Sequence, residues 1–223
     1  MNLKSVFEFI QALDKNNNRE WFADNKPVFL AAKAEFESFI EIIAKQLELV
    51  DSTYRFTRAK DYTFRIYRDV RFSKNKAPYK NHFGAFISNG GRKSPNAGYY
   101  IHIEPNASFV GGGVYRPEKQ FLKAIRQEIY YSYKDLDSIV SSKVFSEYYP
   151  ELMADKLKIG PKDFSKDSDA IEWLKYKSFA VGHAVSNAEL IADDFAKDVI
   201  RGFEILRPMN SFLNNAISEN IED

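Results

Sequence analysis

The sequence predicts an α+β fold in which an antiparallel sheet of at least four strands, about residues 62–115, is flanked by N-terminal and C-terminal helices. Apolar residues recur every three to four positions over the first fifty residues and again after Pro117, as in an amphipathic helix. Between these regions apolar and polar residues alternate, as in a half-buried strand. Helices, then consecutive strands, then further helices favour an antiparallel sheet over a parallel one.

The N-terminal region is predicted to hold three helices. The first carries one apolar stripe, formed by Leu3, Val6, Ile10 and Leu13. Asn17 and Glu20 have the spacing of a capping box, which predicts a short second helix. Pro27 suits the first turn of a third helix, whose apolar spacing continues to Val50.

Four strands are predicted, around residues 64–67, 81–88, 98–105 and 108–115. In the first three, apolar side chains occupy every second position. The segment between the second and third strands, SNGGRKSPNAG, is rich in Gly, Ser and Asn, so we expect a mobile loop there.

Helical spacing returns after Pro117 and continues to the end of the chain. One helix is predicted around Leu136–Val140, and an earlier one carries Phe121, Leu122, Ile125 and Ile129. Capping-box spacing predicts two more helix starts, at Asp169–Glu172 and at Ser186–Glu189. Pro208 is expected to interrupt the last helical region.

Composition restricts the classes of protein to consider. The 223 residues include no cysteine, which excludes disulfides, thiolate catalysis and cysteine-ligated metal. There is no run of about 18 apolar residues and no signal-peptide pattern, so we expect a cytoplasmic protein that does not span a membrane. The length suits a single domain over residues 1–223, and a C-terminal helical subdomain from about residue 117 is the alternative division.

Positive charge is concentrated in residues 60–80, which we call the basic segment. It holds seven cations and two acids, a net charge of +5, whereas the whole chain carries +1. A local positive site on a mildly acidic body predicts binding of a specific anionic group. The candidate ligand-binding side chains here are Arg65, Tyr67, Arg68, Arg71, Lys76, Tyr79 and Lys80. The alternative is a solvated hairpin whose charges pair with acids elsewhere.

The predicted strand register gathers a second set of candidates. If strands 81–88 and 98–105 pair antiparallel, the side chains of one face are all apolar and form the core. The other face carries His82, Gly84, Tyr100, His102 and Glu104, and Phe109 and Gly111 lie opposite His102 and Tyr100 on the next strand. Glycine in a strand marks close approach by another group, so we expect a glycine-floored patch beside the basic segment. The alternative is a helix that covers this face.

The leading functional hypothesis is an anion-binding module for a phosphorylated ligand or nucleic acid, in which Tyr100 and His102 add contacts to the basic segment. One alternative is an enzyme that uses His102 and Glu104 as an acid–base pair near neutral pH. Another is a protein-interaction domain whose basic face docks on an acidic partner. His82, His102 and Glu104 also form a known type of metal-ligand set. Strand histidines are more often hydrogen-bonded surface groups, so no metal ligand or cofactor is assigned. His183 is expected in a loop or turn.

Several segments resemble a known family. They are NNNREWF at 16–22, FRIYRDVRFSKNKAPYK at 64–80, GYYIHIEP at 98–105, FVGGGVYRPE at 109–118, WLKYKSFAV at 173–181 and FLNNA near the end. They are similar to a bacterial and fungal family of conserved hypothetical proteins, domain of unknown function 2461. The resemblance covers nearly the full length and implies one family-length domain. It brings no established reaction, cofactor or catalytic residue to this chain.

Overall fold

The computed structural model describes residues 2–218. The chain divides into two compact units. The first unit comprises the chain up to Ile87 together with Tyr100–Val110 and Ala184–Arg201, and the second comprises Ser88–Tyr99, Gly111–His183 and the chain from Gly202.

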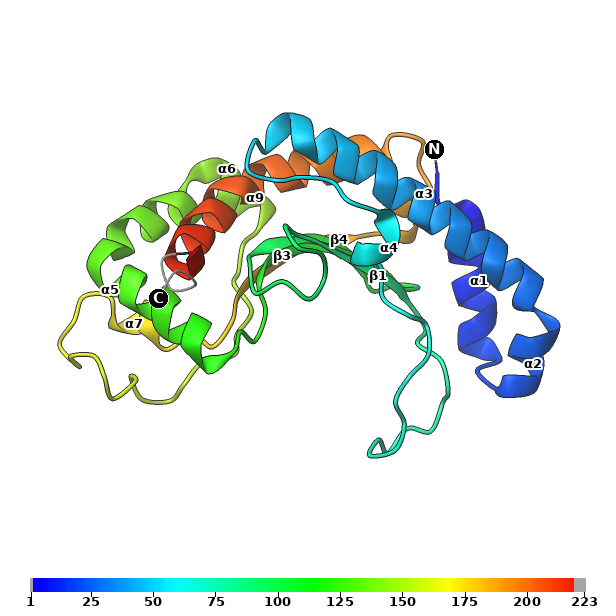
Figure 1. Ribbon diagram of the computed structural model, residues 1–223, viewed down its shortest axis with the longest axis horizontal. Coiled ribbons are helices and arrows are strands. Elements are labelled where there is room, and N and C mark those ends of the chain that lie inside the picture. Colours follow the sequence, from blue (N-terminus) through cyan, green and yellow to red (C-terminus); the bar gives the residue numbers. More distant parts are fainter. Residues whose placement is uncertain (1, 219–223) are drawn as a thin grey trace. The chain divides into compact units, whose positions relative to one another are not determined.

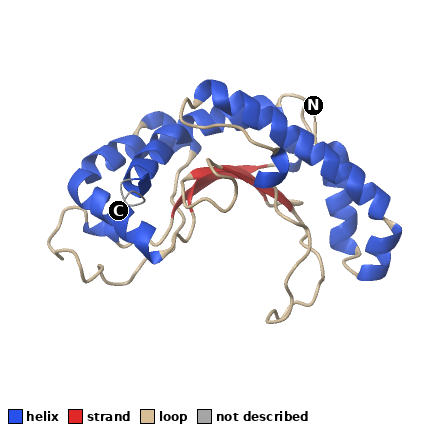
Figure 2. Ribbon diagram, in the orientation of Figure 1, coloured by secondary structure: helices blue, strands red, loops and turns tan. Residues whose placement is uncertain are grey.

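Four strands form one antiparallel sheet in the order β1-β2-β3-β4 (Figures 1 and 2). Helices precede the sheet strands in the sequence and follow them. This arrangement confirms the predicted α+β class. The strands are β1 (Phe83–Ile87), β2 (Gly98–Ile103), β3 (Ser108–Val114) and β4 (Phe179–Val185). The helices are α1 (Lys4–Lys15), α2 (Arg19–Asp24), α3 (Lys26–Val50), α4 (Ala59–Tyr62), α5 (Lys119–Ser141), α6 (Lys143–Tyr148), α7 (Ile171–Leu174), α8 (Asn187–Leu190) and α9 (Phe195–Ser218). Within residues 2–218, no helix combines the length and the apolar character that crossing a bilayer requires.

The side chains of β2 alternate as the sequence predicts. Tyr99, Ile101 and Ile103 are buried, whereas Tyr100 and His102 are only half-buried. Successive strand residues point to opposite faces, so Tyr100 and His102 share the face that does not form the apolar core.

The position of one strand differs from the prediction. Residues 64–67 form no strand, and this part of the chain makes two isolated bridges, Thr63 with Ala85 and Tyr67 with Tyr79. The segment runs into a charged loop that contains Pro78, which lacks the backbone N–H that a regular ladder needs.

The fourth strand is instead β4, so the prediction of a loop or turn at His183 is wrong. The sequence of β4 is FAVGHAV. Its intervening residues Ala180, Gly182 and Ala184 are small rather than polar, so the alternation of hydrophobicity is too weak to predict a strand.

In the first unit, the end of the basic segment is fixed to the connection between α1 and α2. Asn18, rather than the predicted Asn17, caps α2 by accepting a hydrogen bond from the Trp21 backbone N–H. Asn17 instead exchanges two hydrogen bonds with the backbone of Tyr79, at 3.0 and 3.1 Å. The Tyr79 ring stacks on Phe22 with a centroid separation of 3.9 Å, so Tyr79 is a structural anchor.

Two expectations for the later helices are wrong and one is confirmed. The side chain of Asp169 does not cap α7; it accepts a hydrogen bond from the Tyr133 hydroxyl. Pro208 lies inside α9 without ending it, because buried residues on both sides of the proline hold the helix in the core. The capping box of Ser186 and Glu189 is present, at the start of α8.

The strand glycines make room for atoms of the protein itself. A Cβ on Gly84 would stand 2.8 Å from the Tyr100 hydroxyl, and one on Gly111 would stand 2.0 Å from the Val181 carbonyl oxygen. The expected vacancy above these glycines is therefore filled by a tyrosine side chain and by the backbone of β4 rather than left for a ligand.

Candidate functional site

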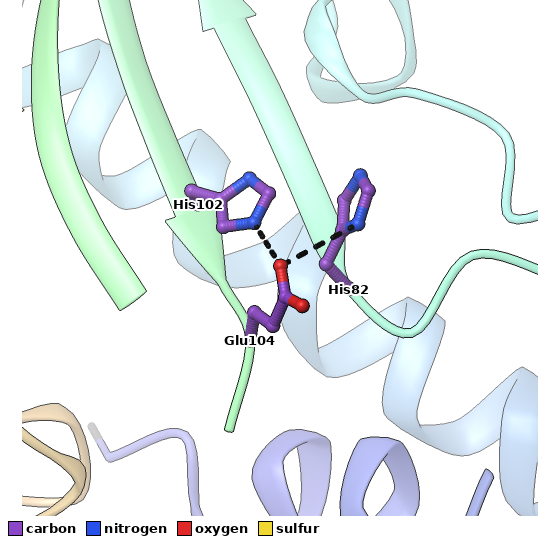
Figure 3. Close-up of side chains that lie close together, drawn as sticks. All are labelled: His82, His102 and Glu104. Atoms are coloured by element: carbon purple, nitrogen blue, oxygen red, sulfur yellow. Dashed lines mark hydrogen bonds and ion pairs between the residues drawn. The ribbon is translucent and has the colours of Figure 1, made fainter. Parts of the chain in front are cut away.

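Three polar side chains meet at the start of β1 and the end of β2, in the first unit (Figure 3). His82 immediately precedes β1, His102 lies in β2, and Glu104 follows β2. Glu104 Oε2 lies 2.8 Å from His102 Nε2 and 4.0 Å from His82 Nδ1. The two imidazole rings lie against each other with centroids 4.3 Å apart. We call these three residues the histidine–glutamate cluster.

Tyr100 extends this cluster into a hydrogen-bonded chain. Its hydroxyl lies 3.0 Å from His102 Nδ1. An ionised carboxylate only accepts hydrogen bonds, so the N–H of a neutral imidazole lies on His102 Nε2 and donates to Glu104. Nδ1 then accepts a hydrogen bond from the Tyr100 hydroxyl. The carboxylate thereby fixes the tautomer of the imidazole, and the imidazole polarises the tyrosine hydroxyl, as in a carboxylate–histidine–nucleophile arrangement.

Neighbouring side chains hold the cluster in position. Asn81 Nδ2 donates to Glu104 Oε1 at 2.8 Å, which leaves Oε2 directed at the histidines. The Ser108 hydroxyl donates to the Glu104 carbonyl at 2.8 Å. The His102 ring stacks on Phe109 at 4.8 Å, which agrees with the predicted register. Glu104 and His102 are thus held by neighbouring side chains as well as by their contact with each other.

Burial shifts the pKa values of two side chains at this site, His82 and Tyr100. Burial, and next the nearby His102 and Lys80, lower the pKa of His82 to about 4, so its imidazole is neutral at physiological pH. Burial also raises the pKa of Tyr100 to about 12, with the Glu104 carboxylate acting in the same direction. A neutral His82 has a lone pair on one ring nitrogen. A protonated Tyr100 is the hydrogen-bond donor that the contact with His102 Nδ1 requires.

Three of the cations predicted to bind an anion are engaged within the basic segment itself. Arg71 makes a bidentate ion pair with Asp69, at 3.0 and 2.6 Å. Arg68 donates to the Ala77 carbonyl and to the Ser73 hydroxyl, at 3.2 and 3.3 Å. Lys76 donates to the Val70 carbonyl at 3.1 Å. These contacts close the loop and reduce the capacity of these side chains for a ligand.

Arg65 and Lys80 differ from the other candidate cations. Within residues 2–218, neither lies within ion-pair distance of a carboxylate. Lys80 is half-buried, and its Nζ lies 5.3 Å from the centroid of the Phe64 ring. Burial, and then the nearby Arg65, lower the pKa of Lys80. Two like charges therefore lie close together beside the histidine–glutamate cluster.

The two candidate tyrosines of the basic segment have different environments. Tyr79 is buried in the first unit, whereas Tyr67 is 49% exposed. Tyr67 also lines a mainly apolar cavity of about 180 Å³ between α3 and the residues after α4. The cavity wall comprises Phe29, Leu30, Lys33, Phe36, Glu37, Thr63, Phe64, Arg65, Ile66, Tyr67 and Phe83.

Comparison with known sequences identifies the family of this chain. The family profile described as conserved hypothetical protein (DUF2461) matches residues 5–212. The chain belongs to the DUF2461 family. The match includes the basic segment and β2, so both regions described above are parts of the DUF2461 sequence pattern. No curated protein and no solved structure matches the chain.

In this DUF2461 protein the structure brings together Tyr100, His102 and Glu104, which the sequence predicted as candidates. Sequence reasoning did not identify the roles of Asn81 and Ser108. The available signals were the position of Asn81 directly before His82 and the four-residue spacing of Ser108 from Glu104, which suits a side-chain-to-backbone turn.

Proposed function

We propose that this protein binds a small anionic ligand at Lys80 and Arg65, beside the histidine–glutamate cluster. The observation that carries the proposal is the half-buried Lys80, which has a second cation next to it and no carboxylate partner in residues 2–218. Removing a charge from water costs free energy, and a bound anion is the group that offsets this cost here. A phosphate or carboxylate group fits two adjacent cations of this kind.

The state of the other side chains favours a small anion over a nucleic acid strand. A strand needs several cations along its phosphates and exposed rings on which bases stack. Phe64, Tyr67 and Phe72 are exposed, but Tyr79 is buried beneath Phe22. Arg68 and Arg71, which adjoin Tyr67 and Phe72 in sequence, are engaged within the loop. The remaining cationic pair matches one anionic group rather than a row of them.

Thermal unfolding of the full chain, measured with a chelator present, tests this proposal. Inorganic phosphate, a dicarboxylate, a nucleotide, a short oligonucleotide and an acidic peptide serve as probes. A ligand at about 100 times its Kd stabilises the folded state by roughly 2.7 kcal/mol, a melting-temperature rise of several degrees. We expect the phosphate or the dicarboxylate to give such a rise in the wild type.

Variants test whether the ligand-induced rise in melting temperature depends on Lys80 and Arg65. Lys80→Met and Arg65→Met are expected to abolish the ligand-induced rise. Arg71→Met removes the same charge from an exposed, already paired position and is the matched control, so it is expected to keep the rise. Equal losses in all three variants, or a response to the oligonucleotide alone, would contradict a small-anion site.

The Tyr100–His102–Glu104 chain supports a second function, acid–base catalysis on the bound anion. A positioned acid–base group typically accelerates a reaction by about 10²–10⁴-fold. If a stabilising anion is converted by the wild type, as followed by NMR, the Glu104→Gln and Tyr100→Phe variants should slow its conversion by at least about 100-fold. Conversion at the wild-type rate in both variants would show that Tyr100 and Glu104 take no part in the reaction.

A further inference from the structure

We infer that His82, His102 and Glu104 form a site for one divalent first-row transition-metal ion, with Zn²⁺, Co²⁺ and Fe²⁺ as the fitting class. One ligand atom from each of the three residues lies within 4.8 Å of the others. Two imidazole nitrogens and one carboxylate oxygen form the ligand set of open zinc and non-haem iron sites. Figure 3 shows the two rings on the same side of the Glu104 carboxylate.

The distances require only small side-chain movements. Ligand atoms placed about 2.1 Å from a tetrahedral ion are about 3.4 Å from one another. Glu104 Oε2 is 2.8 Å from His102 Nε2 and 4.0 Å from His82 Nδ1, values that lie on either side of this spacing. Each distance would have to change by about 0.6 Å to reach that spacing. The three side chains are 11 to 26% exposed, so an ion can enter from solvent and keep a water ligand.

The groups around the cluster orient it as partners of metal ligands do. A ligating histidine usually uses its second ring nitrogen in a hydrogen bond, and a ligating carboxylate is hydrogen-bonded through its other oxygen. Here the Tyr100 hydroxyl lies 3.0 Å from His102 Nδ1, and Asn81 donates to Glu104 Oε1 at 2.8 Å. An ion on His102 Nε2 would require the imidazole proton to lie on Nδ1, where it would be donated to the Tyr100 oxygen while the Tyr100 hydroxyl turns its own proton away from the ring.

Some charges near the site attract a divalent cation and others repel it. Glu104 contributes a full negative charge in direct contact with the ion, and Asn81 connects it to Asp14 through a hydrogen bond of 3.3 Å. Lys80 and Arg68 lie close enough to affect His82 and oppose a dication. Glu104 would contact the ion directly, whereas Lys80 and Arg68 are not ligands and act from farther away, so their repulsion lowers the affinity without removing the site.

The chain provides a built-in control for this proposal. Its three histidines are His82, His102 and His183. His183 lies in β4 and its Nδ1 hydrogen-bonds to the Tyr148 carbonyl at 2.9 Å. A His183→Gln variant therefore removes an imidazole without touching the cluster.

Metal titration of the untagged, chelator-stripped protein tests the site, with Co²⁺ followed by visible absorption and Zn²⁺ followed by calorimetry. The buffer contains no phosphate or carboxylate, so this test and the anion test can fail separately. We expect one equivalent of Co²⁺, displaced by Zn²⁺. His82→Gln and Glu104→Gln should weaken binding by at least about 100-fold, Tyr100→Phe by about 10-fold, and His183→Gln not at all. The Tyr100→Phe result separates a positioning residue from a ligand.

Each contrary result overturns the proposal: no stoichiometric binding to the wild type, unchanged affinity in His82→Gln, or equal weakening in His183→Gln. A variant that fails to fold, as judged by circular dichroism, is replaced by a measurement on the wild type. Co²⁺ should broaden the imidazole NMR signals of His82 and His102 and leave those of His183 sharp. Broadening at His183, or at none of the three, would equally reject the site.

Discussion

The basic segment and the histidine–glutamate cluster both concentrate reactive side chains, but they use them in different ways. In the basic segment, Arg71 and Arg68 bind groups two to nine residues away, so the charge is neutralised or engaged locally. In the cluster, His82 and Glu104 lie 22 positions apart in sequence and still approach within 4.0 Å. A high local charge in a sequence therefore does not show that the charge is available, whereas groups from separate strands can converge on one point.

The two regions also differ in what they contribute to stability. The Arg71 and Asp69 side chains are 77% and 48% exposed, so their ion pair contributes little. The His102 side chain is 11% exposed and joins two hydrogen bonds in a largely buried environment. Hydrogen bonds of that kind leave costly unsatisfied partners when one member is removed.

Replacing His102 is the most damaging change that this comparison predicts. His102→Ala removes the ring stacked on Phe109 and leaves Tyr100 and Glu104 without their shared partner. We expect the free energy of unfolding to fall by about 3 kcal/mol, measured by urea denaturation at neutral pH. A loss below about 0.5 kcal/mol would mean that the cluster is no better packed than the exposed loop.

Acidification should destabilise the protein through His82. Burial, with His102 and Lys80 nearby, lowers its folded-state pKa to about 4, whereas an unfolded histidine titrates near 6.5; Arg68 acts in the same sense and Glu104 opposes it. The unfolded state therefore binds more protons between these values, so the contribution is present above pH about 6.5 and is lost as pH falls toward about 4, by up to about 3 kcal/mol.

The contribution of His82 can be separated from the titration of other groups by comparing the wild type with His82→Gln. The quantity to measure is the difference in their unfolding free energies across this pH window. We expect the wild type to lose its advantage as the pH falls. A constant difference between the two proteins would show that His82 titrates normally.

A double-mutant cycle on Gly84 and Tyr100 tests the packing that replaces the expected vacancy. A Cβ at position 84 would stand 2.8 Å from the Tyr100 hydroxyl, so Gly84→Ala displaces the end of that side chain. We expect a cost of about 1 kcal/mol in the wild type and a smaller cost in the Tyr100→Phe background, which lacks the hydroxyl. Equal costs in both backgrounds would place the clash elsewhere.

The smallest expected effect belongs to the basic segment. Arg71→Met breaks an exposed ion pair, and such pairs contribute little, so the midpoint of urea denaturation should stay close to that of the wild type. A clear fall in that midpoint would show that the loop depends on this pair and would weaken the contrast between the two regions.

Sequence patterns predicted the fold class, the core face of β2 and the pairing of His102 with Phe109, because these depend on strand alternation. They did not predict β4, whose alternate residues are small rather than polar. Nor could they predict what the arginines bind. Whether Arg71 pairs with Asp69 or stays available to a ligand depends on the geometry of the loop, which composition does not encode. The glycines correctly marked close approach, but the approaching groups are Tyr100 and the β4 backbone.

The central claim is that His102 is held between Tyr100 and Glu104 in one orientation. A long-range ¹H–¹⁵N NMR spectrum of the metal-free protein at neutral pH reports the proton position on each imidazole directly. We expect His102 to carry its proton on Nε2 in a single tautomer, and Glu104→Gln to abolish that preference. A proton on Nδ1, or a mixture of tautomers like that of a solvent-exposed ring, would contradict this arrangement.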